Sequence, residues 1–168
     1  MPTIYAADTD GYVYRYSTDT WVNVRGAGTG TSAGASVTGY TRAIRTFHTA
    51  GRGSDTYFVG RSFFAFDTSG ITATVASATL KIYGLTNDDA GGVIAVKATA
   101  PDLSTDIAVA DFDAITGFNG SNTMSGNVTD YSSELATWTT SGYNEITLNA
   151  QALSDMVSLD VLKICVVE

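Results

Sequence analysis

One short pattern in this chain has the form of a catalytic nucleophile. Gly30-Thr-Ser-Ala-Gly34 matches the pattern in which a serine, on a sharp turn between a strand and a helix, attacks a carbonyl carbon. That chemistry requires an acid and then a histidine after the serine, yet no acid lies between Ser32 and His48. The surrounding segment is rich in Gly, Ser and Thr. We therefore interpret the match as a product of biased composition.

The acidic residues do not form an evident pair for glycoside hydrolysis, which needs two carboxyl groups about 5 to 10 Å apart across a cleft. Asp111 and Asp113 share one face of a strand or turn. Glu145 is expected to point to solvent, and the sequence gives no obvious second carboxylate to pair with it. His48 is the sole histidine, which excludes a cluster of histidine metal ligands and favours a hydrogen-bonded surface or edge residue. The sequence predicts that the protein is not an enzyme.

Clustered carboxylates could instead hold calcium, which prefers carboxylate and carbonyl oxygens. The candidate ligands are Asp8 and Asp10, in Asp8-Thr-Asp10-Gly11, and the adjacent pair Asp88 and Asp89. The first cluster lacks the third acid and the distal Glu of an EF-hand loop, and aspartates in turns are the simpler interpretation. We expect no cofactor, with structural calcium as the alternative.

The aromatic residues hold the most functional promise. Tyr12, Tyr14 and Tyr16 are two positions apart, so they share one face of a strand, and Tyr5 and Trp21 lie nearby in sequence. Exposed rings could stack on a sugar or become buried in a neighbouring subunit, whereas inward rings would be core packing. The alternation does not determine which side faces water. These five residues are the candidates for an interface or for glycan stacking.

The elements that must position these side chains are mostly short strands. Residues 61–70 and 76–84 both alternate with a period of two, which indicates antiparallel strands with one buried and one wet face. The polar segment between the two strands predicts that they form a central hairpin. In the first strand, one face is expected to carry Phe64 and Phe66, and the other Arg61, Phe63 and Ala65. In the second strand, one face is expected to carry Ala78, Leu80 and Ile82, and the other Thr79, Lys81 and Tyr83.

The rest of the chain continues this pattern. Residues 26–39 are predicted to be a flexible Gly/Thr/Ser loop, and residues 150–157 one or two helical turns. Further strands are expected at 4–6, 12–16, 20–25, 41–49, 93–97, 143–148 and 161–167. Many strands without a long amphipathic helix predict an all-β fold. We expect residues 1–168 to form a single antiparallel β-sandwich, jelly-roll-like, with one short helical segment near the C-terminus.

Two of these strands also carry a family resemblance. Arg61-Ser-Phe-Phe-Ala-Phe-Asp67, followed by Ala78-Thr-Leu-Lys-Ile-Tyr83, resembles the central hairpin of jelly-roll domains of the disaggregatase-related repeat (DNRLRE-like) type. Residues 110–118 and 138–150 extend the resemblance, which covers about residues 57–167. Similar domains occur as carbohydrate-binding modules, as cell-surface repeats and as phage structural proteins, so the resemblance implies a scaffold more firmly than a function.

Charge and composition narrow the classes of partner. The formal net charge of -8, from 17 acidic and 9 basic residues, disfavours nucleic acids and anionic membranes. No apolar run approaches the roughly 20 residues that span a bilayer. Cys165 is the only cysteine, which excludes an internal disulfide and favours a buried structural thiol. Charged residues make up only 15% of the chain, which is common where flat polar faces meet protein or sugar.

The N-terminal sequence bears on localisation. Met1-Pro-Thr-Ile-Tyr-Ala-Ala-Asp8 lacks the basic and apolar regions of a secretory signal, which predicts synthesis in a host cytoplasm. Together with the resemblance, this favours a non-enzymatic structural protein of a phage virion, most specifically a capsid decoration or cement protein. We expect it to be a homo-oligomer that contacts virion proteins such as the major capsid protein. The alternative is a carbohydrate-binding module that stacks exposed aromatic rings on a glycan.

Overall fold

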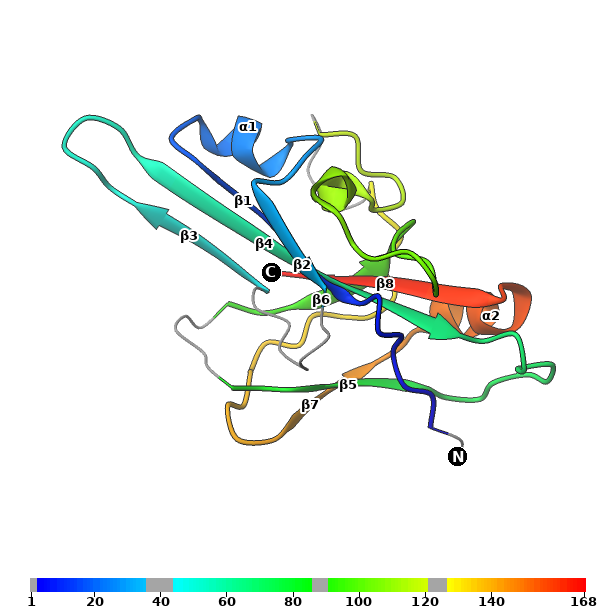
Figure 1. Cartoon of the computed structure of the whole chain (residues 1–168). Helices are drawn as coiled ribbons and strands as arrows, with labels where there is room; N and C mark the ends of the chain where they lie inside the picture. The colour runs from blue at the N-terminus through cyan, green and yellow to red at the C-terminus, as the bar shows by residue number, and fades with distance from the viewer. Residues whose placement is uncertain (1–2, 36–43, 86–90, 121–126) are drawn as a thin grey trace.

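The computed structural model describes residues 3–35, 44–85, 91–120 and 127–168. Within these residues the chain forms two antiparallel sheets that pack face to face (Figure 1), which confirms the predicted all-β sandwich. The larger sheet has six strands in the order β2-β1-β4-β8-β6, and β3 pairs with β4 outside this order. The smaller sheet pairs β5 with β7. The strands are β1 (Gly11–Ser17), β2 (Ser32–Ala35), β3 (Arg45–Thr49), β4 (Thr56–Asp67), β5 (Thr79–Tyr83), β6 (Ile94–Lys97), β7 (Tyr143–Thr147) and β8 (Val161–Val167).

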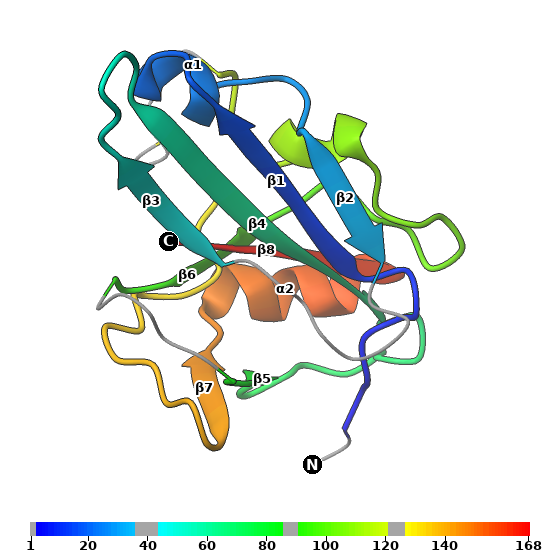
Figure 2. The ribbon, with the colours of Figure 1, turned by 60° about the vertical axis from the view of Figure 1, so that its left-hand side comes forward.

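The predicted helical segment near the C-terminus is confirmed as α2 (Ala150–Ser158). The side chain of Asn149 caps its first turn by accepting a hydrogen bond from the backbone N–H of Ala152 at 3.1 Å. The buried face of α2 includes Ala152 and Asp155, and Ala152 packs into the core between the two sheets. Figure 2 shows the helix itself next to β8.

A second short helix stands where a strand was predicted. Residues 20–25 form α1 (Trp21–Arg25), so the strand prediction there is wrong. Thr20 accepts a hydrogen bond from Asn23 N at 3.4 Å, and the carboxylate of Asp19 accepts from Thr20 N and from Asn23 Nδ2. These local bonds satisfy the free N–H groups of a first helical turn, which the alternation of apolar residues did not reveal.

Strand β4 is the centre of the larger sheet, and both of its faces are buried. Phe63 is 0% exposed on one face and Phe64 is 7% exposed on the other. The prediction of one wet face is therefore wrong for this strand. Residues 63–66 form a continuous apolar run, which is typical of a strand covered on both faces. Strand β1 pairs with one edge of β4, while β3 and β8 follow one another along its other edge.

The predicted central hairpin is also wrong, because β4 and β5 belong to different sheets. After β4 the chain is anchored to the turn before β8: Thr68 N donates to Asp160 O at 2.9 Å and Thr68 Oγ1 donates to Leu159 O at 2.6 Å. The segment that follows crosses to the second sheet, where β5 pairs with β7. The alternation within β5 is as predicted, with Leu80 and Ile82 buried.

Two apolar cores cover the two faces of the larger sheet. On one face, α1, the short 3-10 helix η1 (Val109–Asp113) and the loops around it pack against the sheet. On the other face, β5, β7 and α2 enclose the second core. Strand β8 contributes to both, with Cys165 buried in the first core and Leu162, Ile164 and Val166 in the second. Burial of such side chains contributes roughly 1.5–3 kcal/mol each.

Two further predictions need correction. Residues 4–6 belong to no strand. The predicted flexible loop at 26–39 contains strand β2, which pairs with β1, and its earlier part is held by hydrogen bonds from Gly30 N to Val109 O and from Thr31 N to Tyr14 O, both 2.7 Å. Residues 36–39 lie outside the described residues. Strands β6, β7 and β8 confirm the predictions at 93–97, 143–148 and 161–167 within about two residues at their ends. Strand β3 confirms the prediction at 41–49, but the described strand begins only at Arg45.

Candidate functional site

Strand β1 places Tyr12, Tyr14 and Tyr16 on one face of the larger sheet, as predicted. Two of these rings continue into an aromatic row across three strands, defined by Tyr12, Tyr14, Phe58 and Phe47. Neighbouring ring centroids in the row are 6.2, 5.0 and 4.9 Å apart, with interplanar angles of 6°, 23° and 10°. The row is therefore a series of nearly parallel rings that stand beside one another.

This packing decides which part of the row is accessible. Because the rings face one another, most of their faces are covered, and Phe58 is only 7% exposed. Tyr16 is 51% exposed and has Phe58 as its partner in the register of β1 and β4. The guanidinium of Arg45 lies 4.8 and 4.9 Å from the ring centroids of Phe47 and Phe58. Among the described residues, this face thus presents the ring edges of the row, the exposed Tyr16 and the cation Arg45 in place of a flat platform.

The structure does not bring the other two aromatic candidates into this row. Tyr5 lies before β1, outside any strand, and is 84% exposed. Trp21 begins α1 and packs against the core on the opposite face of the sheet, with its ring centroid 5.9 Å from that of Tyr57. Only the three β1 tyrosines therefore share a surface.

Of the calcium candidates, Asp10 has a clear structural role. It is 5% exposed, and its Oδ1 accepts a hydrogen bond from Ala65 N at 2.9 Å. Burial raises the pKa of Asp10 to about 7, against the opposing effect of this hydrogen bond, and the nearby charge of Asp8 acts in the same direction as burial. Within the described ranges, no three His, Cys, Asp or Glu side chains gather as a metal site would require. Asp88 and Asp89 lie outside the described residues.

The other residues considered for chemistry have local roles. Ser32 lies in β2, opposite Tyr14 in the register of the two strands. His48 is an exposed edge residue, as predicted, with its Nε2 3.2 Å from Asp55 Oδ2. Asp111 accepts a hydrogen bond from Ala108 N at 2.8 Å at the start of η1. None of these contacts forms a nucleophile–base pair or a pair of facing carboxylates.

A buried cation was missed by the sequence reasoning. Arg61 is 0% exposed; its guanidinium donates to the carbonyl oxygens of Phe112 and, at 2.8 Å, of Arg25. The guanidinium carbon also lies 4.0 and 4.7 Å from the ring centroids of Phe112 and Phe118. Burial lowers the pKa of Arg61 to about 10, so the side chain remains charged at neutral pH. Arg61 thus joins α1 and η1 to the centre of the sheet.

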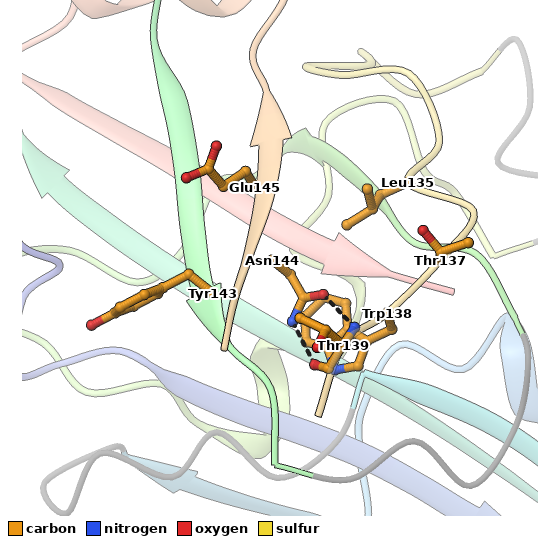
Figure 3. Close-up of a pocket in the computed structure, with 7 residues that line it drawn as sticks. All are labelled: Leu135, Thr137, Trp138, Thr139, Tyr143, Asn144 and Glu145. Carbon is orange, nitrogen blue, oxygen red and sulfur yellow. Dashed lines mark hydrogen bonds between the residues drawn. The ribbon is translucent and has the colours of Figure 1, made fainter. Parts of the chain in front are cut away.

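The second sheet borders a hollow of about 450 Å³, here called the β7 hollow (Figure 3). It lies between β7 and the segment of residues 135–139. Figure 3 shows Tyr143 and Glu145 pointing to one side of β7, whereas Asn144 points toward Trp138 and Thr139. The lining residues are Leu135, Thr137, Trp138, Thr139, Tyr143, Asn144 and Glu145.

Asn144 and Gly84 hold this segment in place. The buried amide of Asn144 accepts from Thr139 N at 2.8 Å and donates to Thr139 O at 3.0 Å. Its two bonds thus satisfy backbone groups of Thr139 that would otherwise pair with a neighbouring strand. A Cβ at Gly84 would collide with the carbonyl oxygen of Thr139 and would lie 2.7 and 2.8 Å from Asn144 Nδ2 and Trp138 Nε1. Glycine at this position therefore lets the segment cross close to the end of β5.

Two exposed tyrosines stand beside the hollow. Tyr83 of β5 and Tyr143 of β7 are opposite one another in the register, and they are 52% and 64% exposed. Their ring centroids are 5.4 Å apart at an interplanar angle of 89°. The next pair on this face is Lys81 with Glu145, whose Nζ and Oε1 atoms are 2.6 Å apart. The side chain of Glu145 is 58% exposed, which confirms that it points to solvent. The alternation of residues 79–83 predicted that this face of β5 is exposed, but it did not predict that β5 pairs with β7.

Comparison with known proteins gives no match: no protein-family model, no curated protein and no solved structure matches the chain. The resemblance to DNRLRE-like jelly-roll domains therefore stays a prediction from the sequence. In the part of the chain that the structure describes, no helix combines the length and the apolar character needed to cross a membrane.

Proposed function

We propose that this chain is a non-enzymatic structural protein of a phage virion, with capsid decoration as its most specific role. It acts through protein–protein contacts made by the sheet face that carries Tyr12, Tyr14 and Tyr16. The observation that carries the proposal is the exposed end of the aromatic row, where Tyr16 and Arg45 flank the buried ring of Phe58. Tyrosine, phenylalanine and arginine are the residue types enriched in protein interfaces.

The position of this face supports the same role. The hairpin of β3 and β4 extends away from β5 and β7 in both views of the ribbon (Figures 1 and 2). A neighbouring subunit could therefore approach the row without meeting the second sheet. We propose that the neighbours are further copies of this chain and other virion proteins, such as the major capsid protein. The net charge of -8 disfavours nucleic acid and anionic membrane as partners.

The carboxylates give further support for a role without catalysis. Asp10 is turned toward the backbone of β4, Asp111 is bonded to the start of η1, and Glu145 is paired with Lys81. Each of these groups has a local partner that explains its position. A hydrolase would need two of them facing one another across a cleft.

The test is to purify particles of the encoding phage on a density gradient and to quantify this chain by mass spectrometry. We expect a fixed ratio to the major capsid protein, and immunogold labelling on the head. A matched pair of variants locates the contact: Tyr16→Ala should lower particle occupancy about tenfold, because interface tyrosines often dominate binding, whereas Tyr143→Ala should not. Absence of the chain from purified particles would contradict the proposal.

A further inference from the structure

We propose that the outer face of the second sheet is a contact through which two copies of this chain pair around a two-fold axis. This surface, here called the β5–β7 face, is separate from the aromatic row. The inference therefore goes beyond the proposed virion role and does not depend on it. The face is made by the six outward-pointing side chains of the two strands: Thr79, Lys81, Tyr83, Tyr143, Glu145 and Thr147.

All six side chains of this face are exposed, because the residues between them point into the core. Leu80, Ile82 and Ile146 are buried between the two sheets. Figure 3 shows Tyr143 and Glu145 directed away from the segment of residues 135–139. The face thus presents aromatic surface directly to its surroundings, and tyrosine is one of the residue types enriched in protein interfaces.

The register of the two strands arranges the face in three cross-strand pairs. The pairs are Thr79 with Thr147, Lys81 with Glu145, and Tyr83 with Tyr143. The first and third pairs join identical residues, and the middle pair joins a cation to an anion. Exchange of β5 for β7 therefore leaves the first and third pairs unchanged and reverses the signs of the middle pair.

This pattern makes the face complementary to a second copy of itself. A two-fold axis parallel to the strands lays β5 of one copy over β7 of the other, in the aligned packing that sheets commonly adopt. Lys81 of each copy then faces the partner's Glu145, so the four charges alternate in sign, and the four tyrosine rings meet at one end of the contact. An axis across the strands would instead place Lys81 on the partner's Lys81. The charges therefore select the first arrangement.

The charge balance of the face also favours a second copy as the occupant. In a two-fold contact a surface meets its own copy, so any excess of one sign would repel itself. The whole chain has a net charge of -8, whereas Lys81 and Glu145 balance one another on this face. The balanced face avoids repulsion at the contact, and physiological salt screens exposed charges that are more than about 8 Å apart.

The size of the face sets the expected strength of pairing. Six residues are fewer than the roughly 20–30 on each side of a standard interface, so we expect a weak dimer with a Kd on the order of 10–100 μM. The two tyrosines should contribute most of the binding energy, because aromatic residues dominate interface energetics. Leu85, two positions after Tyr83, is 54% exposed and adds apolar surface after the end of β5.

The experiment measures the mass of the purified full chain by sedimentation velocity at concentrations from about 1 μM to about 1 mM, a range that brackets the expected Kd. We expect a monomer at the low end and a dimer at the high end. Tyr143→Ala should weaken dimerisation about tenfold, because an interface ring is lost. Tyr5→Ala removes an exposed ring outside the face and should have no effect. Equal thermal midpoints of the variants confirm that the fold is intact.

Charge reversal tests the predicted arrangement of the two copies. Lys81→Glu and Glu145→Lys should each weaken dimerisation at least about tenfold, because each brings four like charges together. The double variant should dimerise again, and so should an equimolar mixture of the two single variants. In that mixture each chain still lacks its own ion pair, so restored pairing can come only from contact between copies. Arg52→Glu makes the same change in net charge as Lys81→Glu at an exposed position outside the face, and it should have little effect.

Four results would overturn the inference: a monomer at every concentration, equal effects of Lys81→Glu and Arg52→Glu, no mixed dimer from the two single variants, or a dimer that Tyr143→Ala leaves intact and Tyr16→Ala dissociates. The last result would place the contact between copies on the aromatic row. These measurements use the purified chain without particles. Failure of this contact would therefore leave the virion role standing, and absence of the chain from particles would leave this contact standing.

Discussion

Lys97 of β6 and Asp155 of α2 form a partly buried ion pair, with Nζ and Oδ2 separated by 2.8 Å. The same carboxylate accepts from the hydroxyl of Tyr131 at 2.6 Å and from Gln151 Nε2 at 3.0 Å. The side chain of Asp155 is only 9% exposed. This network attaches α2 to the edge of the larger sheet, and it links residues that are far apart in sequence.

The first prediction follows from this network. Asp155→Ala should lower the free energy of unfolding by about 2–4 kcal/mol, because it leaves Lys97 and the hydroxyl of Tyr131 without their partner. Urea denaturation measures the change. Lys81→Ala is the matched control: its ion pair with Glu145 is more than half exposed, and its loss should cost less than about 1 kcal/mol. Equal losses from the two variants would contradict the assigned role of Asp155.

The same residue predicts a loss of stability in acid. Burial tends to raise the pKa of Asp155, but the hydrogen bonds from Lys97 and Tyr131 outweigh it and hold the pKa below the ordinary value of 3.8. A lowered pKa means that the charged form is favoured in the folded state. Its contribution is present above the ordinary value and is lost as the pH falls through the folded value. The free energies of unfolding of the native chain and of Asp155→Asn, measured by urea denaturation, should therefore differ less at pH 2 than at pH 6.

Asp10 predicts the opposite dependence of stability on pH. Its folded pKa of about 7 lies above the ordinary value of 3.8, so its contribution is full below pH 3.8 and is lost as the pH rises through 7. Asp10→Asn keeps an oxygen that can accept from Ala65 N but carries no charge. We expect this variant to be more stable than the native chain at pH 8, by roughly 1–2 kcal/mol after allowance for solvent screening, and similar to it at about pH 3.5, below the ordinary value. Chemical denaturation at the two pH values checks this, and an equal difference at both would contradict it.

The strands were predictable where only one of their faces is buried. In β5 and β7, buried and exposed residues alternate strictly, and the sequence showed the same period for Leu80, Ile82 and Ile146. The partner of each strand was not predictable, because alternation contains no information about pairing. Residues 61–67 and 78–83 therefore read as one hairpin, although the chain crosses between the sheets at Thr68.

The candidate site was predictable only in part. The shared face of Tyr12, Tyr14 and Tyr16 follows from their spacing, but the stacking of Tyr14 on Phe58 depends on strand pairing across 44 positions. The pair of Tyr83 and Tyr143 depends in the same way on the register of β5 and β7. Residue type indicated which side chains could bind a ligand, whereas only the fold shows which of them meet.

Arg61 gives a prediction about the core. Arg61→Ala should lower the free energy of unfolding by about 3–5 kcal/mol, because the carbonyl oxygens of Arg25 and Phe112 lose their donor and a cavity remains beside the aromatic rings. Arg61→Lys should also be destabilising, since a single ammonium cannot reproduce the planar fork of donors. Arg52→Ala, at an exposed position, should change stability by less than about 0.5 kcal/mol. A similarly small effect at Arg61 would show that its contacts are not structural.

The last prediction concerns Gly84, which follows β5 and lies beside the β7 hollow. Gly84→Ala places a methyl group against the carbonyl oxygen of Thr139, so the segment that carries Trp138 must move away from β5. We expect a loss of about 1–3 kcal/mol in unfolding free energy, measured by urea denaturation. Gly70→Ala is the control, because nothing lies within 4 Å of a Cβ there. Equal stability of Gly84→Ala and Gly70→Ala would contradict the close approach of residues 135–139 to the end of β5.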